Sequence, residues 1–258
     1  MDYETILYEV SEDRVATITI NRPQALNSFN QKMMDEFKDA WHQIGYDDSV
    51  NAVVLRAAAG RAFCTGVDVK EGYDYSSQTI PWIRRDPSEW LGPKQNRLWK
   101  PVICAIHGMA AGGAFYWINE CDVVICSEDA QFFDPHVSFG MTAACEPIGL
   151  SRRIPLGEVM RITLMGNDER VGADTALRIG LVSEVVANDE LWNRAHELAA
   201  IIAAKPTAAT QGSVRAIWES LDMGLRAAQN WAMPYTQLGN PAGAIDRTKI
   251  PKVKPSIR

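Results

Sequence analysis

Residues 101–122 constrain the fold of this chain more than any other segment. An apolar run at 102–106 is typical of a buried strand, a turn of small residues follows at 108–113, and a second apolar run at 114–118 can continue as a helix. Glycines in such a turn let another group approach the backbone closely, and the first N–H groups of a helix have no partner within it. The turn is suited to a phosphate or to a carbonyl oxygen that becomes negative during reaction, although tight packing of helix on strand explains such glycines equally well.

A second apolar strand is also followed by a turn of small residues. That turn reads Phe-Cys-Thr-Gly-Val-Asp at 63–68, and the first turn carries Gly-x-x-x-Gly-Gly at 108–113. Asn-Arg-Pro-Gln-Ala-Leu-Asn at 21–27 precedes both, and an Ala-x-x-x-Gly-Leu-Val-x-x-Val pattern follows within 173–185. In order and spacing these motifs resemble the crotonase superfamily, which contains the enoyl-CoA hydratases and isomerases. The resemblance extends over about residues 5–200.

Alternating strand and helix patterns favour parallel strand pairing with crossover connections. The 258 residues suffice for one large core and an appendage. The resemblance implies an α/β fold, a crotonase-type spiral of ββα units with a C-terminal helical segment. We therefore expect the spiral core at residues 1–200, and a helical trimerisation segment and tail at 201–258. The expected assembly is a homotrimer or a dimer of trimers, and the apolar C-terminal helices favour such burial.

Local patterns predict most of the secondary structure. Strands at 7–10 and 15–20 should form an antiparallel hairpin, and alternation in the second indicates one buried face. The same patterns predict strands at 51–56, 102–106, 123–126 and 131–133, and helices at 28–44, 151–165, 174–179, 187–204 and 207–229. A tail rich in Pro, Gly and Lys is expected from Pro234 onward.

Residues 71–100 are less regular and rich in aromatic side chains. Tyr73, Tyr75, Trp82, Trp90 and Trp99 stand among Ser, Pro and charged residues. The segment is interpreted either as a surface helix with loops or as a flap that faces substrate. The acyl group cannot be named from this part of the sequence.

Composition restricts the classes of partner. A net charge of -6 gives no support for general binding to nucleic acid or an anionic membrane. The N-terminus is acidic rather than signal-like, and no apolar run approaches about 18 residues. The five cysteines lie mostly in apolar runs without zinc-like spacing, which favours reduced, buried thiols. We expect a cytoplasmic protein with no membrane partner, no metal, and no cofactor other than the coenzyme A that forms part of the substrate.

The resemblance also implies which residues hold an acyl-CoA thioester. The backbone N–H groups of Val67 and Gly113 would form an oxyanion hole, in which two donors stabilise the charge on the thioester oxygen. The residues expected to contact coenzyme A are Arg22, Ala25, Leu26, Ala62, Gly66, Asp68 and Lys70. Lys252 and Lys254 are further candidates for phosphate charge, although surface lysines need no ligand.

The acid/base groups depart from the pattern of a typical hydratase. The positions of its two glutamates correspond here to Tyr116 and His136, so water addition by paired carboxylates is in doubt. Glu146 lies where related isomerases place a single carboxylate, and apolar surroundings would raise its pKa toward that of a useful base. Asp134 can orient or charge His136. A buried tyrosine, a structural histidine and a surface carboxylate remain the ordinary alternatives.

These observations predict an enzyme that processes acyl-CoA thioesters through an enolate, with Glu146, His136 and Tyr116 as its catalytic side chains. The net reaction could be isomerisation, hydration or dehydration. One alternative is a hydrolase that cleaves a C–C bond of a β-dicarbonyl substrate. Another is a non-catalytic protein that binds CoA esters or serves assembly.

Overall fold

The computed structural model describes residues 2–71, 85–239 and 255–257. Tyr73, Tyr75, Trp82, Lys252 and Lys254 lie outside these residues. The chain divides into two compact units, Met1–Lys205 and Pro206–Arg258.

The first unit contains a six-stranded sheet with the order β1-β2-β3-β5-β7-β10. Its strands are β1 (Ile6–Val10), β2 (Val15–Ile20), β3 (Ala52–Ala57), β5 (Val102–Ile106), β7 (Val123–Ser127) and β10 (Glu184–Val186). The β1–β2 hairpin is antiparallel, and every later pair in this sheet is parallel. The predicted hairpin and the predicted parallel pairing are both confirmed.

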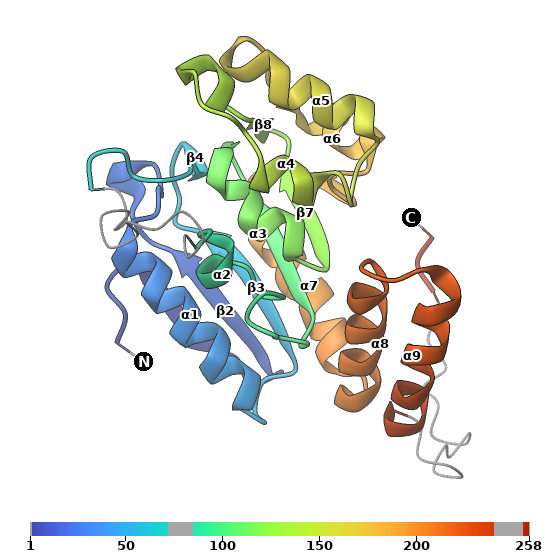
Figure 1. The fold of residues 1–258 in the computed structure, drawn as a ribbon. Helices are drawn as coiled ribbons and strands as arrows, with labels where there is room; N and C mark the ends of the chain where they lie inside the picture. Colours follow the sequence, from blue (N-terminus) through green and yellow to red (C-terminus); the bar gives the residue numbers. More distant parts are fainter. Residues whose placement is uncertain (1, 72–84, 240–254, 258) are drawn as a thin grey trace. The chain divides into compact units, whose positions relative to one another are not determined.

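Both faces of this sheet are covered by helices (Figure 1). On one face, α1 (Gln31–Tyr46) and α3 (Phe115–Glu120) bury Phe37, Trp41 and Trp117 against the strands. On the other face, α7 (Leu191–Ala203) packs through Leu191 and a row of alanines. The prediction of a single buried face for β2 is wrong, because all six of its residues are buried between the two layers.

The first unit also contains a smaller, four-stranded sheet with the order β4-β6-β8-β9. It consists of β4 (Ala62–Cys64), β6 (Met109–Ala111), β8 (Gln131–Phe133) and β9 (Val171–Gly172). Each of β3, β5 and β7 is followed by a short strand of this sheet and then by helical structure. This recurrence is the ββα repeat that the resemblance implies, and it confirms the predicted α/β spiral.

Local chemistry explains where several helices begin and end. Asn30 caps α1, because its side chain accepts a hydrogen bond from the N–H of Met33 at 3.0 Å. The helix expected at 151–165 instead begins after Pro155, as α5 (Leu156–Met165). An unpredicted helix, α4 (Cys145–Leu150), precedes it and accommodates Pro147 in its first turn, where no intrahelical N–H bond is lost. The helix α6 (Ala173–Ile179) ends as predicted at Gly180, whose φ is 81°.

The second unit contains α8 (Thr207–Ser220) and α9 (Leu225–Gly239), which pack on each other. The single helix expected at 207–229 is wrong, because the chain turns between them at 221–224. The tail expected from Pro234 is also corrected, since Pro234 lies inside α9. Ile217, Leu225 and Trp231 are exposed within this unit.

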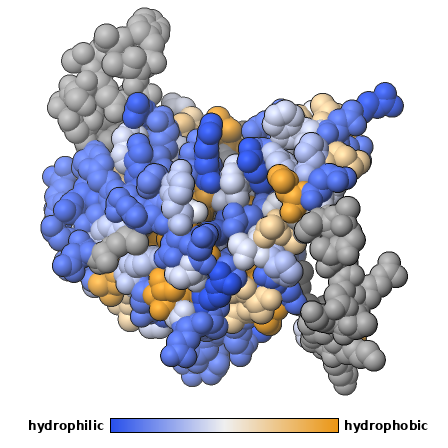
Figure 2. Space-filling view, turned by 90° about the horizontal axis from the view of Figure 1, so that it is seen from below, coloured by the Kyte–Doolittle hydropathy of each residue, from blue (hydrophilic) through white to orange (hydrophobic). Residues whose placement is uncertain are grey.

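On the face seen in Figure 2, apolar residues form small separate patches among hydrophilic ones. Among the described residues, no helix combines the length and the hydrophobicity needed to cross a membrane.

Candidate active site

The site is built where three neighbouring strands of the smaller sheet end. Strands β4, β6 and β8 run parallel to one another, so their carboxyl ends lie at the same edge. The chain leaves these strands through the turn at 65–68, the turn at 112–114 and the segment at 134–136. Motifs that are far apart in the sequence therefore meet at one edge.

The first two turns lie directly against each other. Gly66 adopts φ of 87°, and a Cβ added to it would be 3.1 Å from the backbone nitrogen of Gly113. Phe29 fixes the first turn, because its N–H donates to the Gly66 carbonyl at 2.9 Å and its carbonyl accepts from the Asp68 N–H at 2.8 Å. Among the described residues, the N–H groups of Val67 and Gly113 have no protein acceptor. Two free donors thus stand on adjacent turns.

Position 113 also requires glycine, because the Phe29 ring lies close to its backbone. A Cβ at Gly113 would lie 2.5 Å from Cε1 of Phe29, whose ring fills the space behind the turn. At Gly112, with φ of 52°, the same atom would lie 3.6 Å from Cε1 of His136. The glycine turn is therefore packed between the Phe29 ring and the His136 ring.

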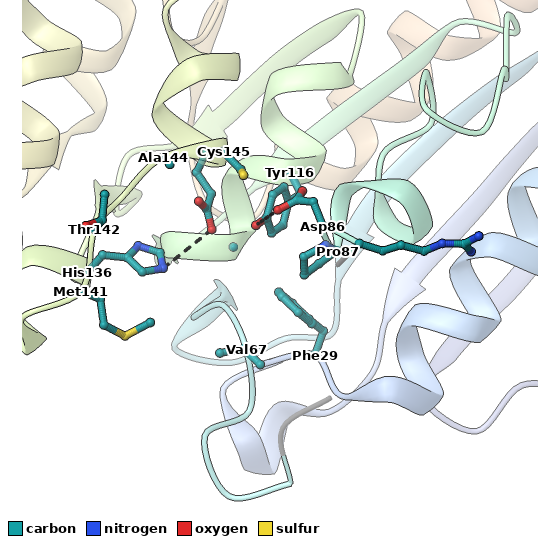
Figure 3. A pocket seen from close by; sticks show the side chains of 13 residues that line it. Phe29, Val67, Asp86, Pro87, Tyr116, His136, Met141, Thr142, Ala144 and Cys145 are labelled. Atoms are coloured by element: carbon teal, nitrogen blue, oxygen red, sulfur yellow. Dashed lines mark hydrogen bonds and ion pairs between the residues drawn. The ribbon is translucent and has the colours of Figure 1, made fainter. Parts of the chain in front are cut away.

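A cavity of about 390 Å³ opens at this edge (Figure 3). The predicted residues Val67, Gly113, Tyr116, His136 and Glu146 all line it. The remaining lining residues are Phe29, Arg85, Asp86, Pro87, Met141, Thr142, Ala144 and Cys145. The structure thus brings together both predicted oxyanion donors and all three predicted catalytic side chains.

Glu146 lies in the first turn of α4 and is only 6% exposed. Its backbone carbonyl accepts a hydrogen bond from Asn119 Nδ2 at 2.8 Å, which ties α4 to α3. Burial raises the pKa of Glu146, although its backbone N–H, the His136 charge and a hydrogen bond with Tyr116 oppose the rise. The result is a buried carboxylate that takes up a proton more readily than an ordinary glutamate.

His136 is held between two carboxylates. Its Nδ1 lies 2.5 Å from Oδ1 of Asp134, and the same oxygen accepts the His136 backbone N–H at 3.0 Å. Its Nε2 lies 3.8 Å from Oε1 of Glu146 (Figure 3). The hydrogen bond with Asp134 raises the pKa of His136 despite partial burial. The prediction that Asp134 orients His136 is consistent with this contact.

Tyr116 stands on α3 and is 7% exposed. Its hydroxyl donates to Oδ2 of Asp86 at 3.0 Å. Burial, followed by the nearby Glu146 and Asp86 charges, raises the pKa of Tyr116 above its ordinary value, so the hydroxyl stays protonated.

Sequence reasoning missed Asp86 and Cys145. Asp86 precedes α2 (Ser88–Leu91), and its Oδ1 accepts the N–H of Ser88 at 3.0 Å, as in an Asx turn. The Asp-Pro-Ser-Glu sequence at 86–89 is typical of such a turn, but nothing local places it beside Tyr116. Burial and interaction with Asp86 raise the pKa of the Cys145 thiol to about 12.

The residues expected to bind coenzyme A lie in or near the turn at 65–68 and near the Asn-Arg-Pro segment at 21–23. Arg22 is buried, with NH1 3.0 Å from Asp68 Oδ2 and NH2 2.9 Å from Glu71 Oε1. In this arrangement its charge is matched within the protein. Lys70 is exposed, and its N–H donates to Asp68 Oδ1 at 3.0 Å.

Three further residues expected to contact coenzyme A lie near the Asn-Arg-Pro segment and in β4. Ala25 and Leu26 are half-buried at the end of the short helix η1 (Pro23–Ala25), and Leu26 adopts φ of 52°. The carbonyl of Ala62 accepts a hydrogen bond from Asn27 Nδ2 at 2.9 Å, which ties that segment to β4. Contact with coenzyme A by these residues stays a prediction.

Comparison with known proteins places this geometry in a family. Residues 11–233 match the family described as enoyl-CoA hydratase/isomerase. The chain is 36% identical over 222 residues to the short-chain-enoyl-CoA hydratase of Clostridium acetobutylicum, covering 84% of this chain and 82% of that protein. It is 33% identical over 221 residues to the (E)-benzylidenesuccinyl-CoA hydratase of Thauera aromatica, covering 85% and 84%. A crystal structure of an enoyl-CoA hydratase/isomerase from Mycobacterium paratuberculosis has a TM-score of 0.82 and 38% identity, covering 92% of this chain and 90% of that chain.

The spiral and the paired glycine turns define an enzyme with the crotonase fold. The chain belongs to the enoyl-CoA hydratase/isomerase family of the crotonase superfamily.

Proposed function

We propose that this enzyme acts on acyl-CoA thioesters by stabilising an enolate, with Glu146 as the group that moves the proton. The observation that carries the proposal is that one cavity contains both the paired glycine turns and the buried Glu146 carboxylate. In the proposed site the thioester oxygen accepts hydrogen bonds from the N–H groups of Val67 and Gly113. Removing one such donor typically costs about 2.7–4 kcal/mol of transition-state stabilisation.

The proposed step begins when Glu146 removes a proton from the carbon next to the thioester. The electron pair of the broken C–H bond moves onto the carbonyl oxygen, where the two N–H groups meet the charge. His136, charged with the help of Asp134, holds the Glu146 carboxylate at the correct side of the cavity. Tyr116 contributes a neutral hydroxyl, since its raised pKa keeps the proton in place. Return of the proton to another carbon gives isomerisation. Transfer of the proton to a β-hydroxyl group, whose C–O bond breaks as the enolate forms the double bond, releases water and gives dehydration.

A second candidate is hydrolysis of a C–C bond in a β-dicarbonyl. His136 favours it, because a histidine between two carboxylates can activate water. Butyryl-CoA in D₂O discriminates between the candidates, since exchange of its α-protons requires only enolate formation. We expect exchange with butyryl-CoA, with turnover of crotonyl-CoA or 3-butenoyl-CoA identifying the net reaction. No exchange, together with cleavage of a β-dicarbonyl, would reject the enolate proposal.

Recognition of the coenzyme part predicts a simple difference in binding. Butyryl-CoA should bind measurably by calorimetry, whereas butyrate should not, because phosphate and adenine contacts come only from coenzyme A. The motif residues near Arg22 and Lys70 motivate this prediction. Equal affinities for the ester and the free acid would contradict it.

We also propose that the chain assembles as a trimer or a dimer of trimers. The exposed Leu225, Trp231 and Leu238 of α9 form apolar surface that an isolated unit would leave in water. Light scattering should then give three or six times the chain mass of 28.6 kDa. A mass equal to one chain at every working concentration would refute the proposal.

A further inference from the structure

Asp86 is the pocket carboxylate that the proposed chemistry has not used. Its two oxygens have different partners: Oδ1 is fixed by the Ser88 N–H, and Oδ2 accepts the Tyr116 hydroxyl at 3.0 Å. In Figure 3 the Tyr116 side chain points into the pocket between Asp86 on one side and His136 on the other. The Asp86 carboxylate is therefore anchored to the backbone by one oxygen and directed at the site by the other.

Glu146 interacts with the same hydroxyl. Hydrogen bonding with Tyr116 lowers the pKa of Glu146, and the charges of Glu146 and Asp86 both act on Tyr116. In this structure the hydroxyl donates to Asp86, and the Glu146 carboxylate lines the same cavity as both residues. A hydroxyl has one proton, so it cannot donate fully to both carboxylates at the same time.

We propose that Asp86 is the second carboxylate of this active site and that Tyr116 relays a proton between it and Glu146. The inference rests on the proposed enolate function and deepens it. After Glu146 has taken the α-proton, its O–H donates that proton to the Tyr116 oxygen, and the Tyr116 O–H bond gives its own proton to Asp86. Glu146 is then a carboxylate again, Asp86 holds the proton, and Tyr116 is unchanged.

The relay would provide the second carboxylate that the resemblance to the hydratases implies. The positions that the resemblance assigns to the two glutamates hold Tyr116 and His136, neither of which is a carboxylate. Asp86 reaches the cavity from the segment before α2, while Glu146 reaches it from α4. The pair is rebuilt from positions outside the family's two glutamate sites.

Other charged groups near the relay have their own partners. His136 lies between Asp134 and Glu146. Interaction with Asp86 contributes to the raised pKa of the Cys145 thiol. Arg85 lines the cavity, with Nε 3.7 Å from Glu89 Oε2. The Glu89 carboxylate provides a matched control, since it lies in α2, close to Asp86 in sequence, but does not line the cavity.

The decisive variants are Asp86→Asn and Tyr116→Phe. The asparagine oxygen can accept the Ser88 N–H in the same turn as aspartate does, so Asp86→Asn keeps the start of α2 while removing the proton acceptor. On butyryl-CoA in D₂O, each variant should reduce α-proton exchange by about 10- to 100-fold, as expected for loss of an acid/base partner. The double variant should be no slower than Tyr116→Phe alone, because Asp86 acts through Tyr116. Glu89→Gln should exchange at the wild-type rate.

A titration without substrate tests the relay separately from the proposed function. The Glu146 carboxyl signal, followed by carbon NMR and assigned with Glu146→Gln, should titrate at lower pH in Asp86→Asn, because the hydroxyl is freed to donate to Glu146. In Tyr116→Phe the pKa of Glu146 should rise, since that donor is lost. Opposite shifts with no exchange in the wild type would support the relay and reject the enolate function. Exchange at the wild-type rate in Asp86→Asn would limit Asp86 to forming the turn before α2 and would overturn the relay. Multiplicative effects of the two substitutions in the double variant would also overturn it, as would an unchanged pKa of Glu146 in Tyr116→Phe.

Discussion

Glu146→Gln is expected to lower kcat by about 10²–10⁴-fold while leaving the affinity for CoA esters nearly unchanged. Glutamine keeps the shape of the side chain and its place in α4, but it cannot accept the proton. Because the active form is the carboxylate, the wild-type rate should fall as the pH falls. Burial raises the pKa of Glu146, so this loss should occur above the ordinary glutamate value of about 4.3.

His136→Ala is the comparison that assigns the roles. If His136 only orients Glu146, the alanine variant should lose less activity than Glu146→Gln. It should also shift the pH dependence upward, because the His136 charge lowers the pKa of Glu146. A fully active Glu146→Gln beside an inactive His136→Ala would make His136 the base. Full activity of both variants would remove this pair from the mechanism.

Gly66→Ala should reduce turnover by about 10²–10³-fold, the usual effect of losing one oxyanion donor. The added Cβ would stand 3.1 Å from the Gly113 nitrogen and 3.3 Å from the Ala111 oxygen, against the N–H proposed to bind the thioester oxygen. A φ of 87° is also strained for alanine, which should lower the free energy of unfolding by roughly 1–3 kcal/mol.

Gly157→Ala is the matched control for this substitution. Apart from its chain neighbours and the backbone of its own helix, no heavy atom of the described residues lies within 4 Å of a Cβ added at Gly157, which is exposed in α5. Urea unfolding should show that this variant is stabilised by about 0.4–1 kcal/mol, with no change in turnover. If Gly66→Ala retained the wild-type rate while losing only stability, the turn at 65–68 would have no part in binding the oxyanion.

The elements that sequence predicted best are those governed by local pattern. Apolar runs predicted β3, β5 and β7, and apolar spacing predicted α1, although from residue 28 rather than from Gln31. The break between α8 and α9 was missed, although Gly224 lies in it, because apolar spacing continues on both sides. The second buried face of β2 depends on α7, which lies more than 170 residues away in sequence. Only the tertiary arrangement reveals such cover.

The same distinction applies to the site. Sequence predicted the two glycine turns, and it predicted Glu146, His136 and Tyr116 through their places in a known pattern. It could not predict Asp86, because no periodicity or motif connects residue 86 with residue 116. It could not predict that Asp68 and Glu71 lie beside the Arg22 guanidinium, because no local pattern connects these residues. Contact of Arg22 with coenzyme A stays a prediction.

The parallel ends of β4, β6 and β8 have a consequence for how such an enzyme can diversify. In the proposed function, backbone N–H groups in the turns after β4 and β6 bind the thioester oxygen, whereas side chains on other segments transfer protons. A backbone N–H donor is kept in most amino-acid substitutions, so the acid/base side chains can change without loss of the proposed hydrogen bonds to the thioester oxygen. In the proposed site, the side chains of Tyr116, His136 and Glu146 could therefore change while the main-chain donors of Val67 and Gly113 stay in place.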